Sequence, residues 1–446
     1  MRLKILSAAL FLCLCSFSKA WADATLLLEE PYSYDGALAG TGHASVYLSG
    51  VCASSPVVLR LCEPGETGVV LSRYHGVTRY DWVAIPLIPY LYAVEKQEDI
   101  PLYADARLVS FLRDRYRRDH LESIVPDEPD GKAPSGDWYE FLGEAYLRTI
   151  YAYEIETTPE QDAALIRRLN GRPNRESYKL VTANCADFAR QIINFYYPHA
   201  VHRSIVGDLG VTTPKQLALT LARYSRHHSE LQTSHFLIPQ VPGALPRSKP
   251  VHGVLECAVT AKKYMLPVLV LHPYIAGSLI AGYIGHGRFD PSTDALVLDA
   301  GNRLGQPMTH ADRRADQDRL DELVKAPAPQ EAAGNRPDLL HTAAEPSFDV
   351  DGEPLLEVRN GGTVTPVGIA RDNILNEPDG FEFAAGLVKA RLREELKPAA
   401  ARKTARSDVE NDLALLQRLL QPQSRESAAG FSSNPGSLRS TLPATP

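Results

Sequence analysis

One cysteine and one distant histidine are the residues of this chain best suited to do chemistry together. Cys185 follows Asn184 at the end of an extended stretch, and the apolar spacing after it predicts a helix that begins at the cysteine. The unpaired amides and the dipole at a helix start favour a thiolate, so we expect the pKa of Cys185 to lie below its free value of about 8.5. A thiolate beside an imidazole is a nucleophile for acyl transfer.

His43 is the predicted partner of this cysteine. It follows the small residues 39–42 and precedes a predicted strand, so its ring is expected at the mouth of that strand. A cysteine and a histidine far apart in sequence are usual for this chemistry, because the pairing is spatial. Cys185 would then be the nucleophile, and His43 first the general base and later the general acid. Each residue also has a structural interpretation, as a core cysteine and as a turn histidine.

A third polar residue normally orients the histidine of such a pair. Glu63 is predicted for this role, because a hairpin centred near Ala53 would place it opposite His43. Three other polar residues compete for the same role: Arg60, Ser72 and Asp81. Asn184 or its backbone is predicted to help stabilise an oxyanion, since amides at a helix start suit that task.

The order of several sequence blocks resembles the Lnb N-terminal periplasmic domain family, within the circularly permuted NlpC-type papain-like fold. The blocks are Gly42–His43, the Arg-Tyr-Asp-Trp run at 79–82, the segment 148–160 before a helix, and Asn184–Cys185. In that permuted branch, which includes relatives of lecithin:retinol acyltransferase, the histidine precedes the cysteine. The match covers about residues 36–200. The resemblance implies an α+β domain with an antiparallel sheet, a helix that carries the cysteine, and thiol hydrolase chemistry.

The start of the chain predicts a secretory signal over residues 1–22. Arg2 and Lys4 precede an apolar run at 5–17, and residues 20–22 supply the small residues that signal peptidase reads. An uncleaved anchor is the alternative. The chain is therefore expected to be periplasmic or secreted.

Four cysteines remain after such a signal, which is too few for a disulfide-stapled scaffold. Cys52 and Cys62 either bridge a hairpin or stay unpaired in the core. The formal net charge of -7 is mild, and no basic stripe interleaved with aromatics predicts nucleic-acid binding. Neither a phosphate-binding loop, nor a dinucleotide fingerprint, nor a His-Glu-x-x-His motif appears, so we predict no cofactor and no metal.

The elements around the pair predict one mixed α+β domain over residues 23–235. The predicted strands are residues 44–48, 57–61 and 149–156, and the predicted helices are 105–118, 158–170, 185–197 and 213–225. The helix at 158–170 has the strongest local signal, with Thr158 as cap, Pro159 in the first turn and a stop at Asn170–Gly171.

An apolar extension at 236–302 and a tail at 303–446 are predicted to follow. Residues 264–285 have no charge apart from His272, and they could form a membrane span, a buried strand or hairpin, or a membrane-surface contact. A basic flank on the exported side argues against the span: Arg247, Lys249, Lys262 and Lys263. The tail lacks tyrosine and tryptophan and is predicted to be mostly disordered. Two islands are predicted within it: a small hairpin at 354–366, centred on Asn360–Gly361, and a helix at 409–420.

The sequence thus favours an exported cell-envelope thiol hydrolase or acyl transferase that acts on amide or ester bonds. A peptide, peptidoglycan or a lipid acyl group would be its substrate, and residues 264–285 its membrane contact. The alternative is a non-catalytic binding or scaffold domain of the cell envelope on the same fold. A third hypothesis is a membrane-tethered accessory protein whose tail recruits a partner.

Overall fold

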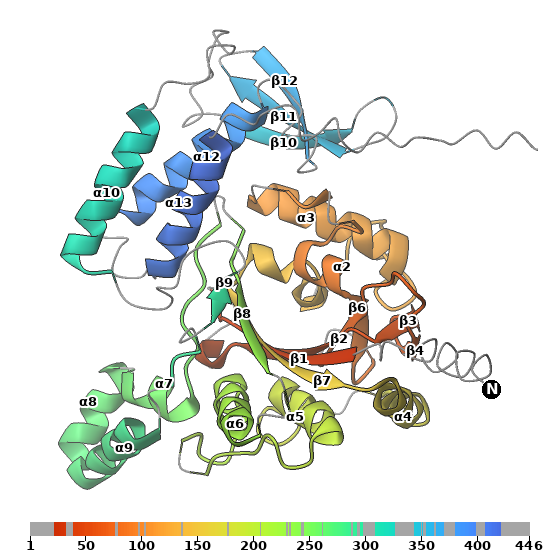
Figure 1. Ribbon diagram of the computed structural model, residues 1–446, viewed down its shortest axis with the longest axis vertical. Coiled ribbons are helices and arrows are strands. Elements are labelled where there is room, and N and C mark those ends of the chain that lie inside the picture. The colour runs from red at the N-terminus through yellow and green to blue at the C-terminus, as the bar shows by residue number, and fades with distance from the viewer. Residues whose placement is uncertain are drawn as a thin grey trace, which may run out of the picture.

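A seven-stranded sheet in the order β6-β5-β2-β1-β7-β8-β9 lies at the centre of the molecule (Figure 1). The computed structural model describes residues 22–32, 39–75, 79–96, 99–101, 104–134, 137–175, 178–205, 207–228, 231, 233–241, 245–260, 262–286, 289–291, 295–297, 308–325, 343–348, 350, 354–360, 363–369, 380–397 and 406–420. The predicted signal lies outside them, except that Ala22 opens the first strand.

The strands of the central sheet are antiparallel except for the last pair, β8 and β9, which is parallel. Their bounds are β1 Ala22–Glu29, β2 His43–Leu48, β5 Val69–Ser72, β6 Val83–Pro86, β7 Ile150–Thr157, β8 Ser234–Ile238 and β9 Leu296–Val297. The α+β class and the antiparallel sheet predicted from the sequence are therefore confirmed.

The central strand β1 explains why the sheet needs helices on both faces. Leu26 and Leu28 point into one apolar cluster and Leu27 into another, so the apolar run of β1 is buried from both sides. In Figure 1 the helices α4 (Pro159–Asn170), α5 (Cys185–Tyr196) and α6 (Pro214–His227) lie below the sheet. The helices α2 (Leu87–Tyr92) and α3 (Ala106–Tyr116) lie above it.

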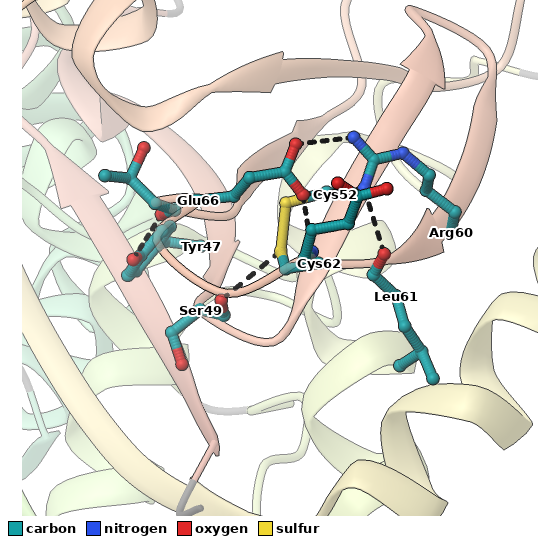
Figure 2. The surroundings of a disulfide bond; sticks show 9 residues. Tyr47, Ser49, Cys52, Arg60, Leu61, Cys62 and Glu66 are labelled. Atoms are coloured by element: carbon teal, nitrogen blue, oxygen red, sulfur yellow. Dashed lines mark hydrogen bonds and ion pairs between the residues drawn. A yellow bond between two sulfur atoms is a disulfide. The ribbon is translucent and has the colours of Figure 1, made fainter. Parts of the chain in front are cut away.

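The segment between β2 and β5 forms a separate hairpin of β3 (Val51–Ser55) and β4 (Val58–Leu61). A disulfide joins Cys52 to Cys62 across it, with the two Cα atoms 4.8 Å apart (Figure 2). Of the two interpretations left open by the sequence, the bridge is the one found. Glu66 lies beside this bridge, but both sulfur atoms are already bonded to each other, so the group offers no thiolate to a metal.

The sheet continues past the predicted domain boundary at residue 235, since β8 and β9 both belong to it. The apolar extension between these two strands forms α7 (Val254–Thr260), α8 (Lys262–Leu271) and α9 (Pro273–His286). Within the described chain no helix has both the length and the apolar character of a membrane span. The predicted stretch 264–285 is instead divided at His272, before Pro273.

The prediction of a mostly disordered tail differs from the structure, which describes helices and a small sheet there. The helices are α10 (His310–Lys325), α12 (Gly380–Glu395) and α13 (Arg406–Leu420), and the strands are β10 (Ala343–Phe348), β11 (Pro354–Asn360) and β12 (Thr363–Gly368). Both predicted islands fall on these elements, one on the paired strands β11 and β12 and the other in α13. Leucine and valine side chains of α12 and α13 form a third apolar cluster. The average composition of the tail does not reveal this cluster.

Candidate active site

The helix α5 begins at Cys185, as the sequence predicts, because its first turn is capped in both directions. The Asn184 side chain accepts a hydrogen bond from the Asp187 amide at 2.9 Å, and the Asn184 amide donates to the Asp187 carboxylate at 3.4 Å. This reciprocal cap fixes the direction in which α5 starts. It places Cys185 in the first turn, on the side of α5 that packs on β2.

The same carboxylate ties α5 to the loop that follows it. Asp187 is buried, and it accepts hydrogen bonds from Arg203 at 2.8 Å and from the Thr212 hydroxyl at 2.6 Å. The Asn184 side-chain amide donates to the carbonyls of Leu180 and Thr212. The amide hydrogens of this side chain are therefore engaged with the backbone, which does not support the predicted oxyanion role of the Asn184 side chain.

The Cys185 sulfur lies between α5 and the sheet, and the residue is only 9% exposed. Burial raises the pKa of the Cys185 thiol to about 11, while the backbone amides of Ala44 and Ala186, which point at the sulfur, act in the opposite direction. The charge of Glu29 adds a smaller upward shift. The expectation of a lowered thiol pKa is wrong, because the loss of water around the sulfur outweighs the helix amides.

His43 begins β2 and is held by residues of the neighbouring strand β5 and its extension. Its Nε2 shares a hydrogen bond of 2.7 Å with the Ser72 hydroxyl, and its ring stacks on Tyr74 with the ring centres 4.4 Å apart. Burial, and then the positive charge of Arg148, lower the pKa of His43 well below 6.5. The imidazole is therefore neutral at pH 7.

The two predicted residues lie on elements that pack against each other, His43 on β2 and Cys185 on α5. Ala44, whose amide points at the Cys185 sulfur, directly follows His43 in β2. The helix α5 packs on β2 along this stretch. Strand and helix thus present a thiol and an imidazole on neighbouring elements, with Ser72 behind the imidazole.

Glu63 does not occupy the predicted position beside His43. It lies on the exposed loop after β4, where its amide donates to Glu66 at 2.6 Å. The amide of Cys62 donates to Gly50 just past the end of β2, whereas His43 begins that strand. The prediction of Glu63 was wrong because β3 and β4 pair only with each other, and β5 is the strand that pairs with the edge of β2.

The three residues that compete with Glu63 lie in different surroundings. Ser72 is the one that contacts His43. Arg60 pairs with Glu66 near the disulfide, with contacts of 2.5 and 2.6 Å (Figure 2). Asp81 pairs instead with the buried Arg73 at 2.5 Å.

Arg73 connects the sheet to the segment that precedes the cysteine. Its guanidinium donates to the Ala183 carbonyl at 3.4 Å and lies over the Phe188 ring of α5, 4.9 Å from the ring centre. Asp81, from the block at 79–82, holds the other side of the guanidinium. This block therefore supports the position of α5.

A buried polar cluster behind His43 was missed by the sequence analysis. Glu29 lies opposite His43 in the β1–β2 register and accepts hydrogen bonds from Ser45 at 2.8 Å and Tyr90 at 2.5 Å. Arg148 lies 3.7 Å from Glu29 and 2.7 Å from Glu144. Burial raises the pKa of both carboxyls, and Arg148 opposes that shift. The only sequence signal for this cluster was Glu29, a charged residue at the end of the apolar strand β1.

Comparisons with known proteins identify no relative of this chain. No family model matches the chain, and neither a curated protein nor a solved structure matches it. The resemblance to the Lnb N-terminal periplasmic domain family therefore stays a proposal that rests on the residues themselves.

Proposed function

We propose that this chain is an exported thiol hydrolase or acyl transferase of the cell envelope, with a permuted papain-like fold. The carrying observation is that α5, which begins at Cys185, packs on β2, which begins at His43, while His43 is held by Ser72. The order of elements agrees with the family resemblance, since the histidine strand precedes the cysteine helix. The substrate class is an amide or ester of a peptide, peptidoglycan or lipid acyl group.

The proposed chemistry starts from a neutral thiol and a neutral imidazole. Nε2 of His43 is engaged with Ser72, which leaves Nδ1 to take the thiol proton. As the Cys185 sulfur bonds to the carbonyl carbon, its proton passes to His43, and the carbonyl oxygen gains negative charge. The imidazolium then protonates the leaving amine or alcohol as its bond to carbon breaks. Water or an acceptor alcohol next attacks the thioester carbon and gives its proton to His43, and this proton passes to the sulfur as the carbon–sulfur bond breaks.

The backbone amides around the sulfur are the oxyanion donors that fit this scheme. The amides of Ala44, Cys185 and Ala186 all act on the Cys185 sulfur. An oxygen bonded to the carbon that the sulfur attacks would lie near the same donors. Such preorganised amides stabilise negative charge that develops during the reaction.

The test is acylation by an activated ester, p-nitrophenyl acetate, followed by mass spectrometry of the modified peptides. We expect acetylation at Cys185, and we expect His43→Ala to slow it by roughly 10²- to 10⁴-fold, the usual contribution of a general base. Ser72→Ala should have a smaller effect, because it acts through His43. The matched control Cys257→Ala removes the other free thiol of the described chain and should leave the rate unchanged.

A non-catalytic binding or scaffold domain of the cell envelope is the second candidate. It is favoured by the burial of the Cys185 thiol and by its raised pKa, which suit a core residue. The acylation experiment separates the two functions. Acetylation confined to surface lysines, with no dependence on Cys185 or His43, would exclude the enzymatic function and favour the scaffold function.

A further inference from the structure

The helices α8 and α9 carry an exposed apolar surface. In the described part of the chain, eight of the sixteen exposed large hydrophobic side chains lie between positions 266 and 284. They are Leu266, Leu269, Val270, Leu271, Tyr274, Ile275, Ile280 and Ile284. The most exposed are Tyr274, at 90%, and Val270, at 77%. Contiguous apolar surface of this kind marks an interaction site in a folded protein.

The distribution of these side chains favours lipid over a protein groove. Leu269, Val270 and Leu271 are consecutive and all exposed. Successive residues of a helix point about 100° apart, so these three side chains span about 200°, more than half of the circumference of α8. A partner helix buries one stripe, whereas acyl chains surround an inserted segment. From 264 to 286 the only ionisable side chains besides tyrosines are His272 and His286.

The base of this hairpin is fixed to the domain through α7. The amide of His252 donates to the Gly40 carbonyl at 2.9 Å, just before β2. The amide of Val254 donates to Asp208 at 2.8 Å, and Glu256 of α7 pairs with Lys215 of α6 at 2.7 Å. In Figure 1, α8 and α9 lie at the lower left, beyond the helices that cover the sheet. The apolar surface is thus presented at one end of the molecule.

We propose that the α8–α9 hairpin docks this protein on a lipid bilayer by inserting into one leaflet. The 10 residues of α8 and the 14 of α9 correspond to about 15 and 21 Å of helix, shorter than a hydrocarbon core of about 30 Å. Lys262 and Lys263 open α8, and Arg288 follows α9 by two positions in the sequence. Cations at both ends of an uncharged segment match the anionic phosphates at a membrane surface. This proposal is independent of the chemistry at Cys185.

The experiment uses the full chain with vesicles of phosphatidylethanolamine and phosphatidylglycerol. Because residues 5–17 are also apolar, the probe must report on the hairpin alone. Tyr274→Trp places an indole on the apolar surface, and Leu61→Trp, at an exposed site on β4, is the matched control. Both variants also carry Trp21→Phe, and the buried Trp82 and Trp138 give the same background in both. Brominated lipid should quench the indole introduced at position 274 and not the one introduced at position 61.

A second set of variants tests the apolar surface itself. Val270→Glu with Ile275→Glu should lower the partition coefficient of the hairpin by on the order of a hundredfold, since two apolar side chains no longer enter lipid. Val58→Glu with Leu61→Glu makes the same charge change on β4 and should have no effect. Equal thermal melts of the two double variants show that both fold.

Two results would overturn the proposal. Absence of quenching at position 274 in vesicle-bound protein would show that the hairpin stays out of the lipid. A dimer in sedimentation experiments that Val270→Glu with Ile275→Glu dissociates, without quenching by lipid, would identify a second copy of the chain as the occupant.

Discussion

Burial disfavours the charged form of both residues of the proposed pair. It raises the pKa of Cys185 to about 11 and lowers the pKa of His43 well below 6.5. A neutral pair is the starting state in which the thiol is the acid and the imidazole the base. Between these two pKa values neither group titrates, so acylation by a neutral ester should vary little from pH 7 to pH 9.

The thiol pKa gives a test at the level of one residue. At pH 8 the native thiolate fraction should be about a hundredfold lower than in the unfolded chain, because the folded pKa is about 11 against 9.0. We therefore expect iodoacetamide to label Cys185 slowly at pH 8 and faster as the pH rises towards 11. The measurement is mass spectrometry of the labelled peptide, with the chain in denaturant as reference. Rapid native labelling at pH 6 would contradict the neutral thiol.

The pH dependence of stability follows from the same shift. A folded pKa raised above the unfolded value means that the folded state holds its proton more tightly than the unfolded state. The contribution of Cys185 to stability is then fully present below pH 9 and is lost as the pH rises from about 9 to 11. Cys185→Ala should remove this part of the alkaline loss of stability.

At the scale of elements, local signals in the sequence predict local structure. The bounds of α4 were predicted because Thr158, Pro159 and Gly171 act within a few residues of the helix ends. The start of α5 at Cys185 was predicted from Asn184 for the same reason. The pairing of β2 with β5 was not predicted, because it depends on where the β3–β4 hairpin turns away. This is why Ser72 was only one of three alternatives and Glu63 was preferred.

The cap of α5 should matter more than an ordinary helix cap. Asp187→Ala removes the acceptor of the Asn184 amide, of Arg203 and of Thr212 together, and all these contacts are at least partly buried. We expect it to lower the free energy of unfolding by about 3 kcal/mol, as for a buried pair that loses one partner. Asp105→Ala, which removes only the side-chain cap of α3, should cost about 1 kcal/mol. Urea denaturation measures both, and equal losses would show that the Asp187 network adds nothing.

At the scale of the whole molecule, the C-terminal helices are joined to the central sheet. Arg247, in the segment after β8, has a side chain that is 10% exposed, and it pairs with Glu395 of α12 at 3.0 Å and with Asp412 of α13 at 2.9 Å. Arg391 of α12 donates to the Val241 carbonyl at 2.8 Å. In the sequence, Arg247 has the position of a flanking charge of a membrane segment, but its charge is compensated by the two carboxylates. A composition average does not reveal such long-range pairs.

The docking of this region gives the last prediction. Arg247→Ala removes one of the two cations that Glu395 and Asp412 share, because Arg391 lies 2.9 Å from each of them. The loss of one partner from a buried ion pair costs about 3–5 kcal/mol, and with Arg391 still in place we expect the lower end of that range. We expect α12 and α13 to resist limited proteolysis in the wild-type chain and to be digested rapidly in the variant, while the central sheet persists in both. Arg60→Ala, which breaks the exposed pair with Glu66, removes the same charge and should leave the digestion unchanged, because exposed pairs contribute about 0–1 kcal/mol. The measurement is the time course of fragments by mass spectrometry. Rapid loss of α12 and α13 from the wild-type chain would favour the disordered tail that the composition predicts. Equal resistance of Arg247→Ala would show that this region is held without the Arg247 ion pairs, by the apolar cluster of α10, α12 and α13 and the remaining pairs of Arg391.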